Sequence, residues 1–221
     1  MPNRRAALVI HRLKPAPGRS EVWPGDGFPK AIPFQYNPES IEQTVQTGPA
    51  ADDGGESLRL AGPPKTTITL TAELLAWHPS LDSSAEKAAA KHGVGHQIAA
   101  LESLLFPTYA EMDRERSLAE RGLVEVVPGE HLLALLVWAE DRIVPVKVTS
   151  LSVTEDRFDD QLRPVHATAQ LSLQVLTVAD LGFDHPGGRV ASRYHRRLER
   201  VARDGTLGPL ATRAFAPDTL T

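Results

Sequence analysis

The sequence has no cysteine among its 221 residues. This absence excludes disulfide bonds, thiolate metal sites and cysteine nucleophiles, so folding does not depend on oxidation. Long apolar runs are missing too. The longest, LLALLVWA at 132–139, is too short to cross a bilayer, and the run after Arg5 is too short for a signal peptide. We therefore expect a cytoplasmic chain without membrane insertion.

Motifs of known catalytic sites are also absent. No GxSxG, P-loop or GxGxxG sequence stands at a strand-to-helix junction. The acidic stretch DDGGES at 52–57 lacks the ligand spacing of a calcium loop, and we interpret it as a solvated loop. His92 and His96 have the spacing of a helical zinc pair, but Gly93 and Gly95 disfavour a rigid helix there. We expect no catalytic residue, no cofactor and no metal ion.

Aromatic residues make up only 5% of the chain, yet three of them lie in FPKAIPFQYNPESI at 28–41. Such a cluster could line a ligand pocket or form a rigid corner between two strands. Phe34 and Tyr36 flank Gln35 and share one face, which predicts that both pack into the core. Asn37-Pro38 is typical of a turn, because Asn can bond its own backbone and Pro sets φ. We predict a structural corner without a pocket.

Alternating apolar and polar residues predict a mainly β fold. The clearest alternation is at 65–77, where apolar residues take turns with threonines. At 142–158 the alternation changes phase between Val148 and Leu151, which predicts a β-bulge. We expect strands at 6–13, 32–38, 40–48, 65–77, 132–139, 142–158 and 164–179.

One packed helix is predicted at 95–106, where apolar residues recur on one face and Pro107 follows. We interpret 78–94 as a flexible insertion that can include one set of helical turns, and 109–122 as a surface helix or loop. The expected fold class is mainly β (α+β), a β-sandwich or small barrel with one packed helix and a C-terminal basic helix.

Charge is distributed unevenly along the chain, whose formal net charge is −4. Residues 186–221 contain seven arginines and three acidic residues, so residues 1–185 have a net charge of −8. We predict two parts, a β domain at 1–180 and a C-terminal basic helix with a tail at 181–221.

The basic segment has the pattern of an amphipathic helix from about residue 188 to 203. Its apolar face is modest, with Val190, Tyr194, Leu198 and Val201. The acidic body disfavours nucleic-acid binding, and the modest apolar face disfavours a membrane surface. A protein-docking helix is therefore preferred. Its candidate partner-binding residues are Arg189, Arg193, Arg196, Arg197, Arg200 and Arg203.

Taken in order, several of these pieces resemble the tube and baseplate-hub proteins of contractile injection systems, which are phage-tail-like particles. The resemblance covers about residues 5–179. It is carried by an aromatic-Asn-Pro step, a Pro-Pro pair, a threonine-rich strand, a central helix and three late strands. These pieces lie at 34–38, 63–64, 67–74, 98–105, 136–138, 148–154 and 165–176.

The resemblance implies a structural protein without an enzymatic reaction. It implies a tail-tube-like fold that closes into a six-membered ring, as hub adaptor or tube initiator between spike and inner tube. The implied partners are copies of the chain itself, the inner tube protein, the spike protein and baseplate wedge proteins. Assembly would begin in the bacterial cytoplasm and end in the particle. Several family members carry a LysM-type module after the tube-like part, where this chain has its basic helix.

Two other functions also fit the sequence. One is a monomeric binding module that docks an acidic partner through the arginine-rich helix. The other is a hydrolase of a phage tail, which predicts a clustered acid pair or a histidine site, and no such cluster stands out in the sequence. The ring alone demands a multimer on assembly, so the oligomeric state separates it from both alternatives.

Overall fold

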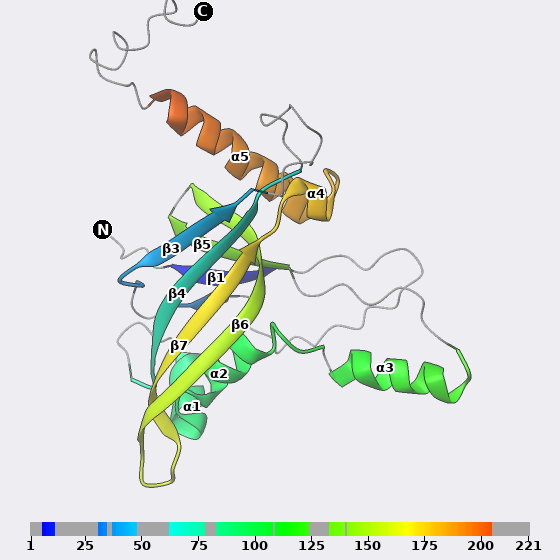
Figure 1. The fold of residues 1–221 in the computed structure, drawn as a ribbon. Helices are drawn as coiled ribbons and strands as arrows, with labels where there is room; N and C mark the ends of the chain where they lie inside the picture. The colour runs from blue at the N-terminus through cyan, green and yellow to red at the C-terminus, as the bar shows by residue number, and fades with distance from the viewer. Residues whose placement is uncertain are drawn as a thin grey trace, which may run out of the picture.

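A computed structural model describes residues 6–11, 31–34, 37–47, 62–77, 83–107, 109–123, 133–139 and 141–204. Within these residues, one antiparallel sheet of seven strands has the order β2-β1-β5-β6-β7-β4-β3 (Figure 1). The strands are β1 (Ala7–His11), β2 (Ala31–Pro33), β3 (Ile41–Gln46), β4 (Lys65–Leu75), β5 (Leu133–Ala139), β6 (Arg142–Phe158) and β7 (Pro164–Val175). The mainly β fold predicted from the alternation is confirmed.

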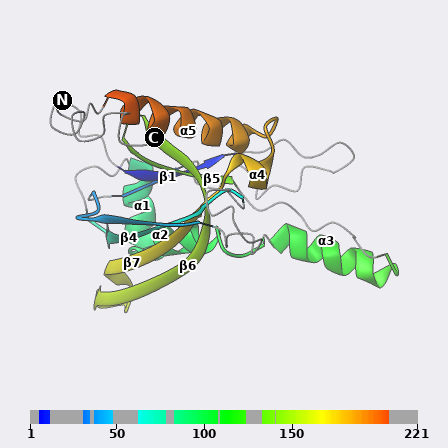
Figure 2. The ribbon, with the colours of Figure 1, turned by 45° about the horizontal axis from the view of Figure 1, so that its top comes forward.

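The sheet is curled into a half-barrel. Strands β2 and β3 stand at opposite ends of the strand order, yet only residues 34–40 join them. A stretch of that length reaches at most about 25 Å, so the two edge strands must approach each other. The ribbon in Figures 1 and 2 shows this curl, with β1 and β5 turned across β4 and β7.

The hydrophobic core lies inside the curl. On β4, Ile68, Leu70 and Leu74 are buried, whereas the threonines between them are partly or fully exposed. The same period of two buries Leu171 and Leu173 on β7, and Leu70 lies directly opposite Leu171. The apolar faces of neighbouring strands therefore coincide, as the alternation predicts.

A β-bulge interrupts β6 where the sequence predicts it. The register between β6 and β7 shifts between Val148 and Ser150. Thr149, the extra residue, donates a hydrogen bond from Oγ1 to the Ser172 carbonyl oxygen at 2.9 Å. Because a bulge increases twist and bends its strand, it helps the long β6 follow the curl.

Five helices complete the described part of the chain. They are α1 (Ser83–His92), α2 (Gly95–Glu102), α3 (Tyr109–Glu120), α4 (Val178–Leu181) and α5 (Pro186–Asp204). The predicted packed helix is α2, whose Ile98 and Leu101 belong to the core. It contacts β2 and β6, which the curl brings to the same helix.

Within 78–94, α1 is the set of helical turns that the sequence interpretation allowed, and it packs against the body. α1 has ten residues, and Ala89 and Val94 are buried. Between α1 and α2 the chain passes close to β7, where Val94 N–H donates to the Pro164 carbonyl at 2.7 Å. Gly93 permits this approach, because its φ is +58° and a Cβ there would lie 2.0 Å from Pro164 O. Small residues here allow close packing against β7.

The last predicted strand also ends earlier than expected, at Val175 and not at 179. Thr177 starts α4: its N–H and its Oγ1 donate to Asp180 Oδ2 at 2.7 and 2.8 Å. The T-x-x-D spacing is a helix-start signal that competes with the strand pattern. The expected boundary between residues 180 and 181 falls inside α4, and α5 contacts β6 of the β domain.

Candidate interaction surfaces

The Asn37-Pro38 corner ties the two ends of the sheet together. Phe34 is fully buried, as predicted, and its N–H donates to the Ala6 carbonyl at 2.9 Å. Asn37 Oδ1 accepts a hydrogen bond from Ala6 N–H at 3.0 Å, and this bond replaces the expected one to its own backbone. The corner thus clamps the start of β1 to the connection between β2 and β3. Gln35 and Tyr36 lie outside the described residues.

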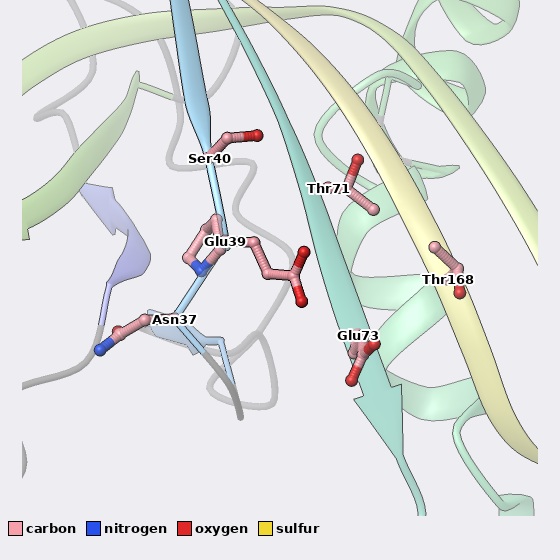
Figure 3. Close-up of a pocket in the computed structure, with 7 residues that line it drawn as sticks. Asn37, Glu39, Ser40, Thr71, Glu73 and Thr168 are labelled. Carbon is pink, nitrogen blue, oxygen red and sulfur yellow. The ribbon is translucent and has the colours of Figure 1, made fainter.

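A hollow lies on the polar side of this corner, contrary to the prediction of no pocket. Its volume is about 440 Å³, and it is open to solvent. Figure 3 shows the Glu39 side chain extending from the corner toward β4, while Asn37 points away. The aromatic Phe34 faces the core instead. The lining residues are Asn37, Pro38, Glu39, Ser40, Thr71, Glu73 and Thr168.

The hollow brings together two carboxylates, from Glu39 and Glu73, which are far apart in sequence. Both residues are exposed. The hollow thus places an exposed pair of acidic residues beside the hydroxyl groups of Ser40, Thr71 and Thr168.

The histidine pair is divided between two helices. His92 ends α1, whereas His96 belongs to α2 and donates from Nδ1 to the Gly93 carbonyl at 2.8 Å. No group of three or more potential metal ligands occurs in the part of the chain that the structure describes. DDGGES at 52–57 lies outside that part.

All six candidate arginines lie on α5, but two of them have partners within the chain. Arg197 Nε donates to Asp141 Oδ2 at 2.5 Å, and its side chain is only 14% exposed. This hydrogen bond holds the pKa of Asp141 below its ordinary value. Arg189 Nη1 donates to the Asp184 carbonyl at 2.7 Å. No described residue pairs with the remaining four, which are Arg193, Arg196, Arg200 and Arg203.

The first half of α5 is seated against the body. Gly187 and Gly188 are buried, and a Cβ on Gly188 would lie 1.8 Å from the Gly182 carbonyl oxygen. Further along, Tyr194 packs near Trp138 of β5, with ring centroids 6.5 Å apart. These contacts and the Arg197–Asp141 pair fix the direction of α5 relative to the sheet.

The second half of α5 extends past the sheet (Figures 1 and 2). Leu198 and Val201 continue the face that carries Tyr194, but they are 42% and 47% exposed. An apolar face that is covered at one end of a helix and open at the other is typical of an incomplete packing surface.

Several stretches of strand edge lack a partner strand in the described part of the chain, including the outer edge of β2 at the other end of the strand order. The outer edge of β3 at Ile41–Gln46 is one end of the sheet. β6 pairs with β5 only through residues 142–146, so 147–158 have β7 on one side and no strand on the other. Such edges present unpaired backbone groups that another strand can bind.

The β6–β7 hairpin ends in an exposed apolar tip. Asp159 holds the turn: its Oδ1 accepts from Gln161 N–H and from Arg163 N–H, each at 2.9 Å. These bonds, with the Arg163 side chain, hold the pKa of Asp159 below its ordinary value. Leu162 is exposed and has a φ of +58°, a backbone conformation that leucine rarely adopts. The strands expected at 142–158 and 164–179 leave room for a short turn, but they do not predict this leucine conformation.

None of the helices in the described ranges combines the length and the apolar character needed to cross a bilayer. Comparison of the sequence with models of known protein families and with curated proteins finds no match.

Proposed function

We propose that this protein is a structural ring component of a contractile injection particle, located at the hub where the inner tube begins, between spike and tube. The observation that supports this most strongly is that two edges without a described partner strand, those of β3 and of β6 at 147–158, belong to one curled sheet. A chain that offers one free edge on β3 and another on β6 can join a neighbour through different surfaces at its two sides.

Contacts between two different surfaces are head-to-tail, and such contacts either close into a ring or grow into a filament. Ring closure through β3 and β6 covers both of these edges, which also protects them from uncontrolled strand pairing. The number of six subunits follows from the resemblance to tube and hub proteins. In this proposal the protein has no catalytic reaction, and the hollow beside Glu39 has no substrate.

A second candidate is a binding module for an acidic partner. The supporting observation is the set of four arginines on α5 that no described residue pairs with, on a helix that extends beyond the sheet. The two candidates are compatible, because a ring component also docks to neighbouring rings. They differ in oligomeric state, since the module alone acts as a monomer.

Co-sedimentation tests the proposed role. The epitope-tagged full chain, expressed in its producing cell, should sediment with phage-tail-like particles. A Thr44→Lys/Val45→Lys variant places two charges on the free edge of β3, and it should remain folded but disappear from the particles. Phe183→Lys, at an exposed position away from both edges, is the matched control. A wild-type chain that stays in the soluble fraction of cells releasing particles would overturn the proposal.

A further inference from the structure

Helix α3 lies apart from the rest of the described protein (Figures 1 and 2). No described element packs extensively against it. A helix of 12 residues is marginal in water when nothing packs on it. A partner outside the chain would therefore add to its stability.

One face of α3 carries exposed apolar side chains. Tyr109 and Met112 are 79% and 47% exposed and lie three residues apart, on the same side of the helix. Arg116 follows on this side, and its charge is balanced by Glu120 Oε1 at 3.0 Å. Asp113 and Glu115 flank the face, one on each side. The net charge of α3 is −2, from four acidic residues and two arginines.

The second half of α5 has the complementary composition. Leu198 and Val201 also lie three residues apart and are exposed. Arg200, and Arg193 in the first half of α5, lie on one flank of this apolar face, toward the arginine-rich side of the helix. Neither has a partner among the described residues. α5 has six arginines and two acidic residues, a net charge of +4. Acidic residues flank both sides of the α3 face. A carboxylate can therefore lie near the arginines in a parallel and in an antiparallel arrangement of the two helices.

The two surfaces lie on opposite sides of the molecule. In both views α3 extends to one side, and the C-terminal end of α5 extends to the other. The described α3 therefore does not reach α5 of its own chain, but a neighbouring copy in a head-to-tail arrangement can offer its α5.

We infer that α3 of one copy docks onto the exposed half of α5 of the next copy, pairing Tyr109 and Met112 with Leu198 and Val201. This inference rests on the proposed ring in one respect only, since it requires a second copy of the chain. The paired surface is small compared with a stable interface, so the contact acts as a clamp in addition to the strand edges.

The absence of cysteine allows a direct test by cross-linking. Full-length chains with Met112→Cys and Leu198→Cys together, assembled in particles or mixed at high concentration, are treated with a short bis-maleimide. The expected result is a ladder of covalent multimers. Neither single-cysteine variant should give more than background dimer, and Phe183→Cys/Leu198→Cys is the matched control pair without a ladder. All three positions are exposed, and the melting temperature checks that the variants fold.

Charge reversal tests the recognition itself. Asp113→Arg/Glu115→Arg on α3, or Arg193→Glu/Arg200→Glu on α5, should lower the ladder yield about two- to fivefold, the effect of exposed ion pairs. Mixing the two reversed chains should restore it. An absent ladder, a cross-link within one chain, or dimers from Met112→Cys alone would each overturn the inference.

The outcomes also separate this inference from the proposed function. A chain that sediments with particles but gives no ladder leaves the ring standing and removes the α3–α5 contact. A chain that gives the ladder in solution but never enters a particle keeps the contact and removes the particle role.

Discussion

At the scale of single residues, the corner after β2 shows how a curled sheet is held closed. Phe34 fills the core, while its backbone and the Asn37 side chain both bond Ala6 at the start of β1. Apolar burial supplies most of the stabilisation, and the two hydrogen bonds set the position of the connection. One short stretch therefore joins the two ends of the strand order.

Truncation of Phe34 should be among the costliest single changes in the protein. Phe34→Ala leaves a cavity in the core, and we expect a loss of about 3–5 kcal/mol in the free energy of unfolding, measured by urea titration. Phe183→Ala, which removes an exposed ring, should change it by less than about 0.5 kcal/mol. Similar values for the two variants would show that Phe34 does not face the core.

The Asn37 clamp has a smaller expected effect. Asn37→Ala leaves Ala6 N–H without its acceptor, and we expect a loss of about 1 kcal/mol. Asn37→Asp keeps an oxygen in the same place and should retain most of the stability. Equal losses for Ala and Asp would mean that the oxygen does not act as the acceptor.

At the scale of elements, the first half of α5 packs against the body, and the apolar face of its second half is exposed. Two glycines, an aromatic contact and one ion pair seat its beginning, and nothing described covers Leu198 and Val201. These contacts fix the direction of the helix, and its C-terminal end remains available for a partner.

Gly188→Ala tests the seat of α5. The added Cβ would meet the Gly182 carbonyl oxygen at 1.8 Å, so α4 and α5 must separate, and we expect a cost of about 1–3 kcal/mol in thermal unfolding. Gly95→Ala meets no atom within 4 Å and is the matched control. It should be neutral or gain up to about 1 kcal/mol, because alanine favours the helix.

The Arg197–Asp141 pair predicts a pH dependence with a defined sign. Because the pKa of Asp141 is lowered in the folded protein, the pair stabilises the fold above the unfolded pKa of about 3.9, and this contribution disappears as pH falls through the folded pKa. The difference in melting temperature between wild type and Asp141→Asn should be constant from pH 5 to 8 and shrink below about pH 4. A melting-temperature difference between the two proteins that stays the same below about pH 4 would contradict the pairing.

Alternation alone predicts much of this fold. Most of the strands expected at 65–77 and 164–179, and the phase change after Val148, appear where the pattern places them, because a period of two leaves one face buried. Local patterns fail where long-range contacts decide. The small residues of α1 show no apolar pattern that would predict its packing. The apolar run at the end of the last strand obscures the Thr177–Asp180 start of α4.

For the candidate surfaces too, local spacing predicts some features, and long-range contacts decide the others. The arginine face of α5 is visible in the sequence, because helical spacing is local. The pairing of Arg197 with Asp141 is not visible, since the two residues are separated by 56 positions. The hollow shared by Glu39 and Glu73, and the isolation of α3, also depend on which strands pair and cannot be derived from local spacing.

At the scale of the whole molecule, the protein has free surfaces on opposite sides. The edges of β3 and β6, and the α3 and α5 extensions, all suit a head-to-tail neighbour. The central claim is that such neighbours close into a ring at the tube-spike junction of a contractile particle.

Cryo-electron microscopy of particles purified from the producing cell tests that claim most directly. We predict density for this chain as a closed ring at the tube-spike junction, with the β3 edge of each copy beside β6 of the next. Particles whose map accounts for every ring without this chain, together with a stable monomer in solution, would contradict it.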